Sequence, residues 1–150
     1  MSLYEMIKDV QIFEAFSEEE KKKFSEMNHS VLEFEKGDAI IKEGDDSASL
    51  YLLLKGSCLI TKTENEATIR LSKLKPGEIF GEMSFFSRKA RQSDVVANDK
   101  VLVINMDHNF FQKIDPDARD KIKDYLIQLL IVRLDNMNSA IMRISKLMRI

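Results

Sequence analysis

The sequence predicts a mainly β fold with flanking α-helices: an antiparallel β jelly-roll barrel with N-terminal helices and a long C-terminal dimerisation helix. Three observations lead to this prediction. Short apolar runs separated by turn residues fill positions 31–106, all five glycines lie between positions 37 and 81, and no glycine or proline follows Pro116. Short strands with frequent turns are typical of sandwiches and barrels, and a long segment without helix breakers favours a helix.

Length and composition limit the class of protein. A chain of 150 residues is the size of one domain. We therefore expect a single domain over residues 1–150, with N-terminal helices at 1–28, a β-barrel at 29–106 and C-terminal helices at 107–150. The net charge of -2 argues against a strongly basic nucleic-acid binder, and the single cysteine, Cys58, excludes an intramolecular disulfide.

The N-terminal region has the spacing of helices. Leu3, Met6, Ile7 and Val10, continued by Phe13 or Glu14, follow one helix face. Ser17 followed by Glu20 has the form of a capping box, which predicts a second helix running through Met27.

The central region reads as a series of strands. Its runs are rich in β-branched and aromatic residues, and turn residues recur every few positions between them. The expected strands are 31–35, 39–43, 50–54, 57–63, 67–74, 93–97 and 100–106.

The C-terminal region predicts a short helix at 107–113 and then one long helix, which Asp115 caps and Pro116 opens. Apolar residues recur along the long helix with alternating spacings of three and four, which favours a coiled coil with a second copy of the chain. An ordinary amphipathic helix is the alternative. The expected homodimer seam consists of Ile127, Leu130, Leu134, Met137, Ile141, Ile144 and Met148.

The segment 80–97, FGEMSFFSRKARQSDVVA, carries the most specific chemistry. Gly81 allows a tight turn and a close approach of the backbone to a ligand, and the residues that follow, Glu82 to Phe86, can form one helical turn. Arg91 can clamp a phosphate while the carboxylate of Glu82 accepts hydrogen bonds from hydroxyl groups. Taken from the residues alone, this ribose-phosphate site and a Glu82–Arg91 salt bridge are equally good interpretations.

This segment resembles the phosphate-binding cassette of the cyclic-nucleotide-binding domain family, which reads roughly Phe-Gly-Glu-Leu-Ala-Leu, a spacer, then Pro-Arg-Ala-Ala-Thr-Val-x-Ala. The match runs over 80–97 without a gap, although Ala90 stands at the common proline. A second stretch, residues 40–60, resembles the family's glycine-flanked hairpin, and residues 12–24 resemble its N-terminal helices.

The resemblance implies a role for each matching position. Gly81 and Ser84 would offer backbone amides to the cyclic phosphate, Glu82 would hold the ribose 2′-hydroxyl, and Arg91 would pair with the charged phosphate oxygen. Gln92 would lie beside the phosphate. The full set expected to bind the nucleotide is Gly81, Glu82, Met83, Ser84, Arg91, Gln92 and Ser93, with Arg133 and Asn136 on the long helix as expected contacts of the base.

The sequence thus predicts a non-enzymatic, homodimeric regulatory module that binds cAMP or cGMP as a ligand and uses no cofactor. The alternative is a dimerising scaffold whose pocket binds no nucleotide. A metal-dependent enzyme on a similar barrel is disfavoured because His29 and His108 are the only histidines. We expect a cytoplasmic protein without a membrane segment, since no run of about 18 apolar residues occurs. DNA binding is not expected, because no helix-turn-helix follows the long helix.

Overall fold

The computed structural model describes residues 2–148, except for the side chain of His29. The chain forms two compact units, divided between Ile114 and Asp115. Within the described residues, the first unit holds eight strands and six short helical segments, and the second holds a single helix. The expectation that residues 1–150 form one domain stays a prediction.

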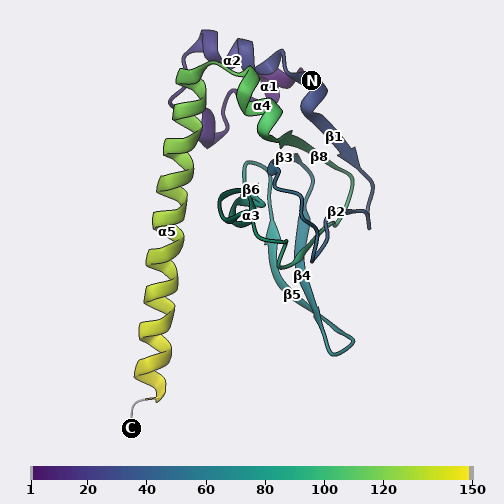
Figure 1. Cartoon of the computed structure of the whole chain (residues 1–150), viewed down its shortest axis with the longest axis vertical. Coiled ribbons are helices and arrows are strands. Elements are labelled where there is room, and N and C mark those ends of the chain that lie inside the picture. The colour runs from purple at the N-terminus through teal and green to yellow at the C-terminus, as the bar shows by residue number, and fades with distance from the viewer. Residues whose placement is uncertain (1, 149–150) are drawn as a thin grey trace. The chain divides into compact units, whose positions relative to one another are not determined.

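Two four-stranded antiparallel sheets make up the centre of the first unit (Figure 1). The first sheet has the order β1-β8-β3-β6, formed by Val31–Phe34, Val101–Met106, Leu50–Lys55 and Ile79–Phe80. The second has the order β2-β7-β4-β5, formed by Ala39–Ile41, Asp94–Ala97, Cys58–Glu64 and Ala67–Leu74. Apart from the hairpin of β4 and β5, strands that are neighbours in each sheet are distant in sequence, as in a jelly roll.

Side chains from both sheets share one apolar core, so the predicted jelly-roll fold is confirmed, but as two facing sheets instead of one closed barrel. Tyr51, Leu53 and Val103 come from the first sheet, and Cys58 and Val95 come from the second. The Tyr51 ring stacks on that of Phe80, with 5.2 Å between centroids. The cysteine thiol is completely buried, and burial raises its pKa to about 11.

The structure contains all seven strands that the sequence predicts, with bounds that differ from the predicted ones by at most two residues. The strand that sequence reasoning missed is β6, because two residues are too few to show a period. It pairs with β3, placing Phe80 opposite Tyr51 and Ile79 opposite Leu52. This pairing matters for function, because β6 leads directly into the segment that the sequence marks as a site.

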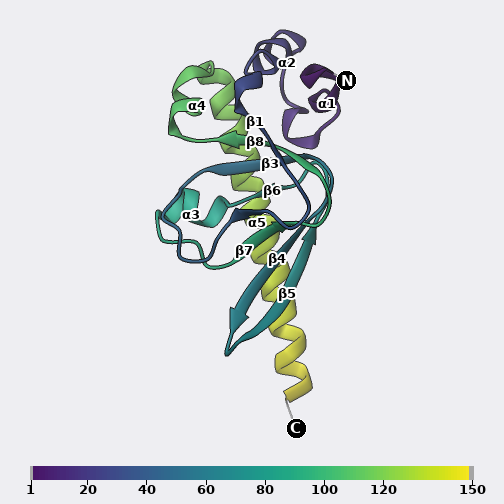
Figure 2. The same ribbon diagram turned by 90° about the vertical axis from the view of Figure 1, so that its right-hand side faces the viewer.

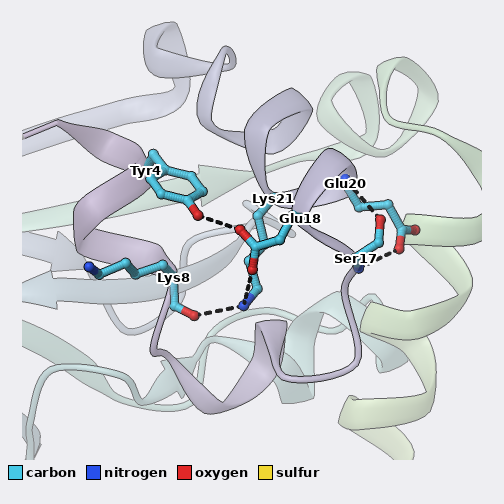
Figure 3. Close-up of polar contacts among 6 residues, drawn as sticks. All are labelled: Tyr4, Lys8, Ser17, Glu18, Glu20 and Lys21. Atoms are coloured by element: carbon cyan, nitrogen blue, oxygen red, sulfur yellow. Dashed lines mark hydrogen bonds and ion pairs between the residues drawn. The ribbon is translucent and has the colours of Figure 1, made fainter.

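The N-terminal helices are α1 (Leu3–Ile7) and α2 (Glu18–Ser25), with a 3₁₀ turn at Gln11–Phe13 between them and another at Asn28–Ser30 after them. Figure 3 shows the predicted capping box at the start of α2: the Glu20 amide donates to Ser17 Oγ at 3.1 Å, and the Ser17 amide donates to Glu20 Oε1 at 2.9 Å. The same view shows the Tyr4 hydroxyl donating to Glu18, a bond that lowers the pKa of that carboxyl.

The prediction of one helix face from Leu3 to Phe13 is wrong in detail, because the helix ends at Ile7 and the chain is extended at Val10. The break lets the Phe13 ring pack against Phe24, at 4.6 Å between centroids. Tertiary packing therefore overrides the local period. Phe24 in turn contacts Phe110 of α4 (His108–Lys113), and in Figure 1 α1, α2 and α4 gather at one end of the sheets.

The second unit is the helix α5 (Pro116–Met148), whose 33 residues are continuous as the sequence predicts. Its length is about 50 Å at ~1.5 Å per residue. Six of the seven seam residues are exposed in the single chain, with exposed fractions from 51% at Ile127 to 75% at Met148, and Leu130 is half-buried. Among residues 2–148, no helix is both long enough and apolar enough to cross a membrane.

Candidate functional site

The site is built around the turn between β6 and α3 (Glu82–Ser87), which lies beside β3 and β6 in Figure 2. Gly81 occupies this turn with a φ of +83°, a left-handed conformation that favours glycine. A Cβ atom there would lie 2.9 Å from Arg91 Nη1 and 3.0 Å from the Ser49 carbonyl oxygen. Glycine is therefore favoured both by the backbone conformation and by the closeness of the Arg91 side chain.

Arg91 is a buried and well anchored side chain in this region, with an exposed fraction of only 4%. Its Nη1 donates to the Gly81 carbonyl at 2.8 Å and its Nη2 to the Ser49 carbonyl at 2.6 Å. The hydroxyl of Ser47 lies 3.4 Å from both Nε and Nη2. The β2–β3 loop, residues 42–49, thus holds the guanidinium from one side.

Backbone hydrogen bonds fasten the same loop to the chain at Arg91. The Arg91 amide donates to the Asp45 carbonyl, and the Gly44 amide donates to the Arg91 carbonyl, both at 2.8 Å. Asp94 contributes as well, because its Oδ1 accepts from the Glu43 amide at 2.7 Å. The position of the guanidinium therefore depends on the β2–β3 loop, more than 40 residues away in sequence, as well as on Gly81.

The charge of Arg91 is buried without a carboxylate partner. All three of its side-chain acceptors are neutral oxygens, and the ion pairs found among residues 2–148 do not include it. The described residues therefore do not form the Glu82–Arg91 salt bridge, which was one of the two interpretations from sequence. Burial lowers the pKa of the guanidinium, the nearby Tyr51 and Asp45 side chains partly offset this effect, and arginine stays protonated in proteins. A buried cation of this kind is poised to receive an anion.

A cavity of about 280 Å³ opens beside Arg91 and is lined by all seven residues that the sequence places in the nucleotide site. Gly81, Glu82, Met83 and Ser84 come from the start of α3, and Arg91, Gln92 and Ser93 precede β7. Ile41, Ile60 and Val95 add apolar side chains from the second sheet. Arg133 and Asn136, expected to contact the base, lie on α5 in the second unit, so their role stays a prediction.

Besides the apolar Ile41, Ile60 and Val95, sequence reasoning missed three further residues that line the cavity, namely Ser87, Lys89 and Ala90. The available signal was their position between Glu82 and Arg91, which bracket the segment. Lys89 is exposed and brings a second cation, so Glu82, Lys89 and Arg91 together give the lining a net charge of +1. Glu82 itself is 9% exposed.

The helix α3 connects the cavity to α4 through aromatic rings. The ring centroid of Phe85 lies 5.4 Å from that of Phe111 and 6.1 Å from that of His108. The Phe85 and His108 rings are stacked, with an interplanar angle of 23°. Phe85 does not line the cavity, in contrast to the neighbouring Ser84. A movement of α3 would therefore displace these ring contacts with α4, which directly precedes α5 in sequence.

Comparison with known proteins identifies the family. A family model described as "Cyclic nucleotide-binding domain" matches residues 31–115, more than half of the chain. The chain belongs to this family. The match includes both sheets, the β2–β3 loop and the whole cassette (residues 80–97). The resemblance seen in the sequence is thereby confirmed.

One curated protein and two solved structures illustrate what the chain is similar to. The chain is 31% identical over 122 residues to a cAMP-dependent protein kinase regulatory subunit of Debaryomyces hansenii, which covers 81% of this chain but only 26% of that protein. The catabolite activator protein of Thermus thermophilus shares the fold with a TM-score of 0.75 at 23% identity, covering 89% of this chain and 62% of that one. A cyclic nucleotide-binding domain from Methylobacillus flagellatus gives a TM-score of 0.74 at 23% identity, covering 93% and 80%. The chain thus spans about a quarter of the length of this regulatory subunit.

Proposed function

We propose that this chain is a non-enzymatic regulatory module that binds cAMP or cGMP in the cavity beside Arg91. The observation that carries the proposal is the guanidinium of Arg91, which is 4% exposed and bonded to neutral oxygens alone. A cyclic phosphate supplies the missing negative charge, and hydrogen bonds to charged groups contribute about 1.5–3 kcal/mol each. The family membership supports the same ligand class.

The remaining residues of the cavity complete the proposed site. Glu82, at the start of α3, accepts from the ribose 2′-hydroxyl, and the amides near Gly81 and Ser84 face the phosphate. Met83, Gln92 and Ser93 line the cavity around them, and apolar Ile41, Ile60 and Val95 offer a surface for the nucleoside. Arg133 and Asn136 of α5 remain the proposed contacts of the base.

The charge of the lining favours a cyclic over a linear nucleotide. The net charge of +1 from Glu82, Lys89 and Arg91 is balanced by a phosphodiester with one negative charge. A 5′-monophosphate carries nearly two negative charges at neutral pH and would leave one unbalanced. We therefore expect AMP to bind more weakly than cAMP.

Signalling would follow from the ordering of α3. A ligand that binds one arrangement of the cassette better than another shifts the population toward it. Because Phe85 contacts Phe111 and His108, this shift would pass to α4 and from there along the chain to α5.

We further propose that the module is a homodimer through the seam of α5. In a heptad assignment, the a positions are Ile127, Leu134, Ile141 and Met148 and the d positions are Leu130, Met137 and Ile144, an unbroken apolar pattern that is typical of a coiled coil. Replacement of Leu134 by Lys, an exposed position, should convert the dimer to a monomer in analytical ultracentrifugation. The control Ser139→Lys, exposed on the same helix outside the seam, should remain a dimer. If Leu134→Lys stays dimeric, the seam is not the interface.

The binding proposal is tested by thermal melting with each nucleotide. A ligand at about 100 times its dissociation constant adds about 2.7 kcal/mol of stability, so cAMP or cGMP should raise Tm clearly while AMP at the same concentration raises it less. If neither cyclic nucleotide shifts Tm at millimolar concentration, the alternative of a dimerising scaffold without a nucleotide is favoured.

A further inference from the structure

The hydroxyl of Ser47 occupies a position suited to an anion. Its Oγ is equidistant from Nε and Nη2 of Arg91, at 3.4 Å from each. These two nitrogens form the edge of the guanidinium whose parallel N–H groups bind carboxylates and phosphates in a bidentate manner. The neutral Ser47 Oγ therefore lies, at the outer limit of hydrogen-bond length, in the place where an anion could offer one oxygen to each nitrogen.

The other edges of the guanidinium are already used. Nη1 donates to the Gly81 carbonyl and Nη2 to the Ser49 carbonyl, which fixes the orientation of the planar group. The edge facing Ser47 cannot turn away without breaking these two short bonds. The β2–β3 loop that carries Ser47 is in turn fastened to the backbone of Arg91 at Gly44 and Asp45.

Ser47 is also accessible to another protein. The residue is exposed and lies in a part of the β2–β3 loop without helix or strand structure. Glu43, Asp45 and Asp46, also exposed, stand just before it. A loop of this charge suits an enzyme with a basic substrate groove.

We propose that Ser47 is a phosphorylation site whose phosphate binds the Nε–Nη2 edge of Arg91 and thereby competes with nucleotide for the same cation. A serine kinase supplies the group from a nucleoside triphosphate. The bond between Ser47 Oγ and the γ-phosphorus forms, and the bond from that phosphorus to the bridging oxygen breaks. The nucleoside diphosphate leaves with the electron pair, and the hydroxyl proton passes to a base of the kinase.

The pairing follows from charge and from tethering. A phosphoserine carries close to two negative charges, whereas Arg91 has no carboxylate among its acceptors. Because Ser47 is held beside Arg91 by the loop, its phosphate acts at a high effective concentration that a free nucleotide must overcome. The carboxylates of Asp45 and Asp46 repel the phosphate and act against the pair, so the balance of these charges is what the experiment measures.

The effect on nucleotide binding rests on the proposed function, but the pairing itself does not. The full chain is prepared with phosphoserine incorporated genetically at position 47, and ³¹P NMR follows its second ionisation. Pairing with Arg91 should lower that pKa by about one unit from its usual ~6, and Arg91→Gln should restore it. A pKa that is the same with Arg91 and with Gln at this position would overturn the proposal, whatever the protein binds.

Calorimetry with cAMP and cGMP provides the second arm. Relative to the unmodified chain, phosphoserine at 47 should weaken binding at least tenfold, while phosphoserine at the exposed Ser2 should leave it unchanged. Equal affinity of the unmodified and 47-phosphorylated chains would contradict competition for Arg91. If the unmodified chain binds neither nucleotide, the proposed function fails, and the ³¹P measurement still decides the pairing.

Discussion

Replacement of Gly81 by Ala separates the two reasons for a glycine at the site. The alanine must adopt a φ of +83°, which costs roughly 1–2 kcal/mol for a residue with a side chain. In addition, its Cβ would lie 2.9 Å from Arg91 Nη1 and 3.0 Å from the Ser49 carbonyl oxygen. Arg91 would have to move from the position in which its charge faces the cavity.

Gly77 provides a matched control. It has a φ of +92°, but nothing lies within 4 Å of a Cβ built there. Gly77→Ala therefore carries the backbone cost alone. We expect it to lose about 1–2 kcal/mol, equivalent to roughly 2–8 °C in Tm for a chain of this size, and to keep its nucleotide affinity.

The assay combines urea unfolding with calorimetric titration of cAMP and cGMP. Gly81→Ala should lose at least as much stability as Gly77→Ala and, unlike it, should lose at least tenfold in affinity. That factor corresponds to about 1.4 kcal/mol, the lower end of what a charged hydrogen bond contributes. The reasoning is refuted if the two variants bind nucleotide equally well, because the close approach of Gly81 to Arg91 would then have no part in binding.

Three further predictions concern separate features. Ser17→Ala removes the capping box of α2 and should lower the free energy of unfolding by about 1 kcal/mol in urea, without a change in nucleotide affinity. The pKa of the Cys58 thiol is about 11 in the folded chain and near 9.0 in the unfolded chain, so the unfolded chain loses the thiol proton first as pH rises. The free energy of unfolding should therefore fall between pH 9 and pH 11, and urea melts of Cys58→Ala should show a smaller fall. Lys89→Gln removes an exposed cation from the cavity lining, so it should weaken cAMP binding by less than about fivefold and reduce the salt dependence of binding. A loss of affinity as large as that of Arg91→Gln would mean that Lys89 is the main phosphate ligand.

The parts of the fold that the sequence predicts are those with local signals. The strand β5 matches its predicted bounds because turn residues flank an eight-residue run, and the capping box of α2 needs only Ser17 and Glu20. The helix break near Val10 is missed because it depends on the packing of Phe13 against Phe24, which the local pattern does not contain.

The residues of the site also divide into those with local sequence signals and those without. The cassette lies in one continuous segment, so its binding residues could be predicted from glycine placement and resemblance, and all seven predicted residues line the cavity. Ser47 and Ser49, which hold the guanidinium, are separated from Arg91 by 44 and 42 residues. No spacing rule links positions so far apart, and only the folded β2–β3 loop brings them together.

The central claim is that a buried guanidinium without a carboxylate partner binds the phosphate of a cyclic nucleotide. Calorimetric titration of cAMP and cGMP into the chain and into Arg91→Gln tests it most directly. The account predicts saturable binding to the unsubstituted chain and an affinity about 10- to 100-fold lower for the variant, as expected from the loss of one charged hydrogen-bonding partner. Equal affinities of the two proteins, or no binding of either nucleotide to the unsubstituted chain, would contradict the account.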